Sequence, residues 1–314
     1  MKFGGALIKP TGNDSDKTDL YQLAADAGYK IVKTQSDAQK LTAKDGKAIV
    51  ISEKLADSNA MSYDMDAADG EWRLADYVQK GIEVLDNPSG FFMMVEGGKI
   101  DWACHANDAA ATIHDTIAFS NAVDEAVKFY NEHPAETLIL VTGDHETGGL
   151  TIGFAGTNYD TYLTNLNNQK ISFAKFDSDY VAEYKKNQTK LIDVWEDIEE
   201  MFGLVTPYDK EGAENSKLVL TDYEYEKILK AYTKTISSDK TRTQEEYEQY
   251  GTYEPLTVTI VHILNNKSGI DFASYSHTGI PVPVFAIGKG EDLFKGYYDN
   301  TDIFKKLASL TKVK

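Results

Sequence analysis

Six acidic and histidine side chains stand in three short clusters, each of which follows a segment that reads as a buried strand. In chain order they are Glu96, Asp101, His105, Asp144, His145 and His277. Carboxylate oxygen and imidazole nitrogen are both ligands of zinc, and carboxylate oxygen suits the harder magnesium ion. If the folded chain brings the clusters together, it has the ligands for a metal centre.

The spacing favours joint ligation, although each cluster alone is weak evidence. Asp101 and His105 are four residues apart, so on a helix they share one face and present a carboxylate beside an imidazole. An isolated pair of this kind is more often a hydrogen-bonded surface pair. Asp144-His145, close to a pair of glycines, is more often a turn or helix cap, and His277 alone is more often a loop histidine. Only the combination argues for a site.

The elements that must position these residues are those of an α/β fold. Strand and helix patterns alternate through the first 155 residues, which predicts a sheet layered with helices. The predicted helices lie at 20–28, within 66–85 and at 105–131, and the predicted strands at 30–32, 48–52, 91–95, 137–142 and 150–154. The first two clusters then follow the strands at 91–95 and 137–142.

After Gly156 the chain becomes rich in Tyr, Lys, Asp and Glu, with helical patterns at 179–186, 192–202 and 222–236. We interpret residues 157–253 as a largely helical insertion lobe within one α/β metal-binding domain, formed by residues 1–156 and 254–314. Strands are predicted again at 256–264 and 282–287, and a last helix at 302–310. His277 follows the first of these strands. Since ligands bind outside the carboxyl ends of strands in open α/β sheets, the three clusters are predicted to converge.

Composition excludes several other kinds of protein. A net charge of −18 argues against binding to a nucleic-acid backbone. An anionic substrate would need a local reversal of this field, which bound metal ions provide. The single cysteine, Cys104, excludes an internal disulfide and a Cys-only zinc site. No apolar run reaches the ~18 residues needed to span a bilayer, and the opening Met1-Lys2-Phe3-Gly4-Gly5 does not have the apolar core of a signal peptide.

Three segments of the sequence also resemble the alkaline phosphatases. They are MVEGGKIDWACHANDAA at 94–110, VTGDHETGGL at 141–150 and SHTG at 276–279. The resemblance runs from about residue 3 to the end of the chain, apart from the insertion. Trp102 after Asp101, together with the long insertion, resembles a bacterial subgroup. The resemblance implies an alkaline-phosphatase-like sheet sandwiched by helices, here incomplete, hydrolysis of phosphate monoesters, a homodimer, and a periplasmic or secreted parent protein.

The resemblance also implies a role for each candidate residue. Asp101, His105 and His277 match the ligands of the zinc ion that activates water and stabilises the leaving oxygen. Asp144 and His145 match two ligands of a second zinc ion, and Glu96 matches a ligand of magnesium. Trp102 occupies a position that faces the substrate side in such enzymes, with a packing role as the alternative. In this family a serine attacks phosphorus, and the phosphoserine is then hydrolysed.

Several parts of the family pattern have no match among these 314 residues. They are the opening strand with a metal-bridging aspartate, the nucleophilic serine, the phosphate-binding arginine and the remaining magnesium ligand. Asp57-Ser58-Asn59-Ala60 superficially resembles the nucleophile segment, but it lies too late in the pattern, so Ser58 is not assigned that role. We therefore expect one complete zinc site and little or no turnover by this chain alone.

Other readings stay open at this level. A phosphodiesterase, a cofactor-independent phosphoglycerate mutase or a sulfatase of the same superfamily would use related ligands. A non-catalytic metal-binding or oligomerisation module is an alternative of another class. The insertion at 157–253 could form a dimer contact or gate the substrate. His262 lies in the predicted strand 256–264 and is interpreted as a core residue, and His114 as a packing or hydrogen-bonding residue of the long helix.

Overall fold

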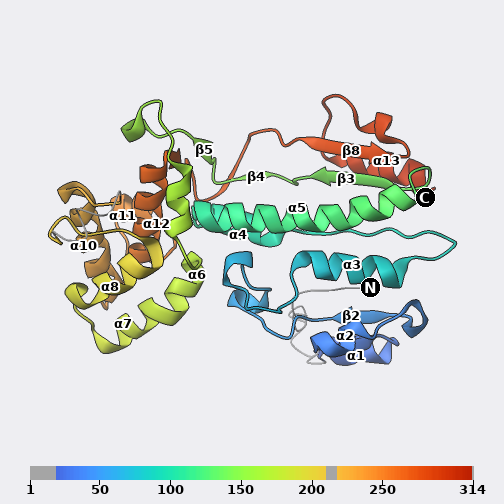
Figure 1. Cartoon of the computed structure of the whole chain (residues 1–314), viewed down its shortest axis with the longest axis horizontal. Coiled ribbons are helices and arrows are strands. Elements are labelled where there is room, and N and C mark those ends of the chain that lie inside the picture. The colour runs from blue at the N-terminus through green and yellow to red at the C-terminus, as the bar shows by residue number, and fades with distance from the viewer. Residues whose placement is uncertain (1–18, 210–217, 313–314) are drawn as a thin grey trace.

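The computed structural model describes residues 19–209 and 218–312. The long helix α5 (Ala109–Glu132) runs through the middle of the molecule, with a helical lobe at one end of it (Figure 1). A narrow β-ribbon lies along one side of α5, and helix α3 (Leu74–Leu85) packs on another side. This mixture of helices and small sheets agrees with the predicted α/β class. Helix α4 (Gly98–His105) and the ribbon carry all the candidate ligands except Glu96.

The ribbon is formed by two segments far apart in the chain, 138–152 and 270–288, which run antiparallel in three successive pairs (Figure 1). The pairs are β3 (Leu138–Thr142) with β8 (Val284–Gly288), β4 (Glu146–Thr147) with β7 (His277–Thr278), and β5 (Thr151–Ile152) with β6 (Ile270–Asp271). The ribbon thus brings the second and third clusters side by side.

A small N-terminal unit contains two parallel strands, β1 (Lys30–Val32) and β2 (Ala48–Val50), with helices α1 (Leu20–Asp26) and α2 (Gln35–Gln39). Strand β2 is buried along its length, and it packs with Leu41 and with Tyr77 and Val84 of α3. The predictions of a helix at 20–28 and of strands at 30–32 and 48–52 are therefore confirmed.

The helical lobe has its own core. Its helices are α6 (Phe173–Phe176), α7 (Ala182–Asn187), α8 (Leu191–Phe202), α10 (Asp222–Ile236), α11 (Gln244–Tyr250) and α12 (Pro255–Ser268). Phe176, Ile198, Phe202 and Ile228 are fully buried in this core. Each buried apolar side chain of this size contributes about 1.5–3 kcal/mol relative to exposure. The helices predicted at 192–202 and 222–236 are confirmed, and the pattern at 179–186 corresponds to a π-helical turn followed by α7.

The strand predicted at 256–264 is wrong, because these residues lie in α12. Pro255 occupies the first turn, where its missing N–H leaves no bond unmade, and Gly269 ends the helix in the left-handed conformation with φ 77°. Leu256, Ile260 and Leu264 are all fully buried. A helix buried on every side shows no polar face, so its apolar run cannot be told from a buried strand by periodicity.

The strand predicted at 91–95 is also wrong. Within the described part of the chain no backbone pairs with this segment, and Phe92 and Met94 are 65% and 81% exposed. An apolar run forms a strand only where a neighbouring backbone completes its ladder. The strands predicted at 137–142, 150–154 and 282–287 correspond to β3, β5 and β8, but β3 is only half-buried and β5 is exposed.

The helix predicted at 105–131 begins four residues later than expected, at Ala109, and His105 instead ends helix α4 (Gly98–His105). The buried carboxylate of Asp108 accepts a hydrogen bond from the Ala111 amide and caps α5. Helix α13 (Thr301–Thr311) corresponds to the last predicted helix. No helix in residues 19–209 or 218–312 combines the length and apolar character needed to cross a membrane.

Candidate metal centre

Helix α4 carries the first two candidate ligands. Asp101 and His105 are one turn apart on it, and the Nε2 atom of His105 lies 3.5 Å from Oδ1 of Asp101. The helix packs against α5, whose first turn follows α4 after three residues. The sequence spacing of four residues therefore produces the side-by-side carboxylate and imidazole.

The ribbon carries the other two histidines. In the β4–β7 pair His277 lies opposite Thr147. Thr147 is the second residue after His145, so the two histidines are close to each other. The imidazole rings of His145 and His277 stack with their centroids 3.4 Å apart. Gly148 continues the ribbon at φ 85°, and a Cβ atom there would lie 2.7 Å from the carbonyl oxygen of Cys104. Glycine thus permits the ribbon to approach the end of α4.

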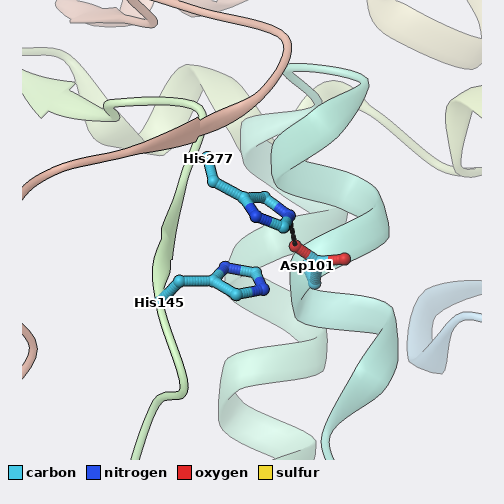
Figure 2. A group of neighbouring side chains, drawn as sticks. All are labelled: Asp101, His145 and His277. Carbon is cyan, nitrogen blue, oxygen red and sulfur yellow. Dashed lines mark ion pairs between the residues drawn. The ribbon is translucent and has the colours of Figure 1, made fainter. Parts of the chain in front are cut away.

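These elements bring Asp101, His145 and His277 into one cluster (Figure 2). One candidate ligand atom from each residue lies within 4.8 Å of the others. Nε2 of His277 is 3.9 Å from Oδ1 of Asp101, the contact drawn as a dashed line in Figure 2. Three segments that lie far apart in the sequence therefore contribute one carboxylate and two imidazoles to the same place. This donor set fits zinc.

Hydrogen bonds orient two of the imidazoles for ligation. The Thr147 hydroxyl donates to Oδ1 of Asp101 at 2.5 Å, so its oxygen accepts from Nδ1 of His145 at 3.1 Å. Nδ1 of His105 donates to the carbonyl oxygen of Tyr275 at 2.6 Å, because a carbonyl oxygen can only accept. In the neutral form of both histidines, Nε2 then keeps its lone pair. A second partner that fixes the tautomer in this way is typical of metal-binding histidines.

The remaining predicted ligands lie outside the three-residue cluster. His105 adjoins it, with its ring centroid 5.1 Å from that of His277. Oδ2 of Asp144 is 3.4 Å from Nε2 of His145, and the Asp144 side chain is 88% exposed. Glu96 is exposed, and the cluster does not include it. The division of the ligands between two zinc ions and a magnesium ion stays a prediction.

Trp102 is half-buried beside the cluster. Its side chain packs against a small buried cluster that includes Tyr63, and Nζ of Lys99 lies 4.2 Å from the Trp102 ring centroid and 4.1 Å from that of Tyr63. Lys99 also forms an ion pair with Asp57 at 2.6 Å. These contacts give Trp102 a packing role through a cation–π interaction, and its contact with substrate stays a prediction.

Cys104, on the same helix, is not suited to bind the metal. Burial raises the pKa of its thiol to about 11, and its Sγ atom lies 3.6 Å from the Thr112 hydroxyl. Since the thiolate is the ligand form of cysteine, a thiol that keeps its proton is a poor ligand. This agrees with the nitrogen and oxygen donor set of the cluster.

Sequence reasoning missed the groups that orient the ligands. Thr147 could have been noticed, because it stands two residues after His145 and points to the same side if the segment is extended. The carbonyl oxygen of Tyr275 offered no signal, since every residue has one. Asn107, two residues after His105, also offered no signal, because its side-chain hydrogen bonds to Ser274 and His262 reach distant segments.

Comparisons with known proteins place these features in a family. The sequence profile of the family described as "Alkaline phosphatase" matches residues 5–313. Alkaline phosphatase 4 of Bacillus subtilis is 30% identical over 287 residues, which cover 90% of this chain and 52% of that protein. The chain spans about half the length of the curated relatives that it matches.

Solved structures agree with the sequence comparison. A cold-active alkaline phosphatase from the psychrophile Shewanella sp. superimposes with a TM-score of 0.69 at 26% identity, covering 93% of this chain and 62% of that one. Thermus thermophilus alkaline phosphatase gives a TM-score of 0.69 at 22% identity, covering 99% and 62%. The second likeness is one of fold alone.

Proposed function

Because the chain belongs to the alkaline phosphatase family, we propose that it supplies the zinc-binding part of a phosphomonoester hydrolase. The observation that carries the proposal is the convergence of Asp101, His145 and His277 from three distant segments. Acidic groups alone are common on a surface with a net charge of −18. Two histidines gathered beside one carboxylate are not explained by that charge.

We assign the ligands as the family resemblance implies. Asp101, His105 and His277 would hold one zinc ion, since three protein ligands with one open position form a catalytic type of zinc site. Asp144 and His145 would supply two ligands of a second zinc ion. Glu96 would contribute to a magnesium site, which oxygen ligands suit.

When bound, the two zinc ions would neutralise charge on the transferring phosphoryl group and hold the attacking and leaving oxygens in line. The chain's own residues prepare the site. Thr147 donates to Asp101 and holds its carboxylate toward the histidines. The carbonyl oxygen of Tyr275 holds the ring of His105 so that Nε2 faces Asp101. The site therefore needs little rearrangement of these side chains.

We further propose that the nucleophilic serine is not among these residues. No stretch at the expected place in the family pattern matches its segment, and the chain spans 52% of the relative from Bacillus subtilis. On this account the chain alone hydrolyses phosphate monoesters slowly or not at all. An assay with an aryl phosphate and added zinc and magnesium tests this, and turnover at a rate typical of enzymes would contradict it.

Zinc stoichiometry tests the ligand site. Equilibrium dialysis of the chain against micromolar zinc should give about one tightly bound ion per chain, since one three-ligand site is complete. The His277→Ala variant should lose this ion, because two protein ligands rarely hold zinc at such concentrations. His114→Ala is the matched control, since His114 is an exposed histidine of α5. Equal zinc in the wild type and in His277→Ala would contradict the proposal.

A further inference from the structure

The short turn between α4 and α5 contains a buried polar side chain that the metal-ligand pattern does not use. Asn107 is 3% exposed and has the left-handed backbone conformation, with φ 56°. Asparagine is among the few residues besides glycine that adopt this conformation readily. The residue lies two positions after His105, at the point where α4 meets both the ribbon and the helical lobe.

The side-chain amide of Asn107 joins three parts of the chain. Its Nδ2 atom donates to the carbonyl oxygen of Cys104 at 2.9 Å and to that of Ser274 at 2.8 Å. Its Oδ1 atom accepts from Nε2 of His262, on helix α12, at 3.1 Å. Both amide hydrogens and the amide oxygen are therefore used. Buried networks that are satisfied in this way fix one arrangement of the groups that they join.

Helix α12 contributes a second contact to the same turn. Nδ2 of Asn265 donates to the backbone carbonyl of Asn107 at 2.7 Å, and Asn265 lies one turn beyond His262. Burial lowers the pKa of His262 to about 4, so its imidazole is neutral at pH 7. Since Oδ1 of an amide only accepts, the proton of this neutral ring is on Nε2.

The partner of Asn107 on the other side is the loop that leads to His277. The amides of Ala273 and Ser274 both donate to the carbonyl of Gly148 at 3.0 Å, and the amide of Gly148 donates to the carbonyl of Ser276 at 3.0 Å. The carbonyl of Tyr275, in the middle of this loop, is the acceptor that orients His105. The position of the loop therefore affects two of the proposed zinc ligands at once.

The adjacent residue ties the same turn to the start of the helical lobe. Asp108 is fully buried, and its carboxylate accepts from Nε2 of Gln169 at 2.8 Å and from the amide of Phe173 at 2.9 Å. The turn thus has contacts with both ends of the lobe, the segment before α6 and the helix α12. A displacement of the lobe would therefore also displace the C-terminal end of α4.

We propose that Asn107 is a positioning residue that, together with His262, couples the helical lobe to the metal centre by holding the loop 273–277 against α4. The inference rests on the proposed zinc site for its functional meaning, but the positioning itself can be measured without metal. The helical lobe contains none of the proposed zinc ligands. Through Asn107 it would nevertheless affect the affinity of the site for zinc.

Asn107→Asp is the first test, because it keeps the size of the side chain and tolerates the backbone conformation while removing both N–H donors. In the zinc-free chain the amides of Ala273 and Ser274 should exchange with deuterium at least about 10-fold faster, while amides of β3 and α10 should be unchanged. Zinc affinity should fall by about 10- to 100-fold, the usual effect of losing a group that orients ligands. Asn168→Asp is the control, because it makes the same substitution and adds the same negative charge at an exposed position of the lobe.

A second pair of variants separates positioning from general stability. His262→Phe retains a ring beside Tyr275 but removes the donor to Asn107, and should reproduce the local effect. His262→Gln keeps an N–H donor and should restore most of the protection. If exchange rises equally at 273–274, β3 and α10 in these variants, Asn107 only stabilises the fold and the inference is wrong. If the wild type binds no zinc but the local exchange effect is seen, the proposed zinc site fails and the positioning stands.

Discussion

Replacing Asp101 with asparagine should weaken zinc binding by on the order of 1,000-fold. Asp101 contributes the only carboxylate of the cluster, and its Oδ1 atom lies 3.5 Å from Nε2 of His105 and 3.9 Å from Nε2 of His277. Asparagine has nearly the same size and can still accept from the Thr147 hydroxyl. The variant therefore removes the negative charge and leaves the local packing in place.

Competition with a chromogenic zinc chelator measures this change in affinity. A factor of 1,000 corresponds to about 4 kcal/mol of binding free energy. Asp292→Asn is a suitable control, because that carboxylate is 82% exposed and forms an ion pair with Lys295 on the surface. An affinity within threefold of wild type for Asp101→Asn would show that zinc, if bound, is held elsewhere.

Removal of zinc should lower the melting temperature of the chain by roughly 10 °C. An ion that binds only the folded state stabilises it by about 4 kcal/mol at a thousandfold excess over its dissociation constant, and each kcal/mol shifts the melting temperature of a domain of this size by about 2–4 °C. The effect should be large because the assigned ligands join α4 to strand β7 of the ribbon, which comes from a distant part of the chain. Scanning calorimetry with zinc and with a chelator measures it.

The His277→Ala variant is the control for this experiment. Without His277 the ribbon retains its backbone pairs but the proposed site loses a ligand, so chelation should change the melting temperature by less than about 2 °C. A shift of the same size in wild type and variant would mean that the stabilising ion binds at a site without His277.

The local part of the candidate site could be predicted from the sequence. Asp101 and His105 were expected to share a helix face, and they lie one turn apart on α4. Asp144 and His145 were expected just after a strand, and they follow β3. Such features depend on residue type and short spacing, which a sequence displays directly.

The contacts that complete the site could not be predicted, because they depend on pairing between distant segments. The register that sets His277 opposite Thr147 is a property of two strands separated by the whole helical lobe. The hydrogen bonds of Asn107 reach the loop before His277 and helix α12, and no short pattern links those positions.

The two wrong strand predictions have a common physical origin. Residues 256–264 and 91–95 are apolar runs whose composition suits a strand, a buried helix or an unpaired extended segment. Helix α12 is covered on all sides by the lobe, whereas Phe92 and Met94 are exposed. The surroundings decide between these outcomes, and a single sequence does not contain them. His262 was expected in a strand core, and it instead faces Asn107 from α12.

Anomalous diffraction at the zinc edge from crystals of the zinc-loaded chain tests most directly that distant segments of the chain form one metal centre. The account predicts a peak bounded by Asp101 of α4 and His277 of β7, with a second histidine, His105 by our assignment, as a further ligand. A chain that binds zinc only at surface carboxylates, with no peak between α4 and the ribbon, would contradict the account.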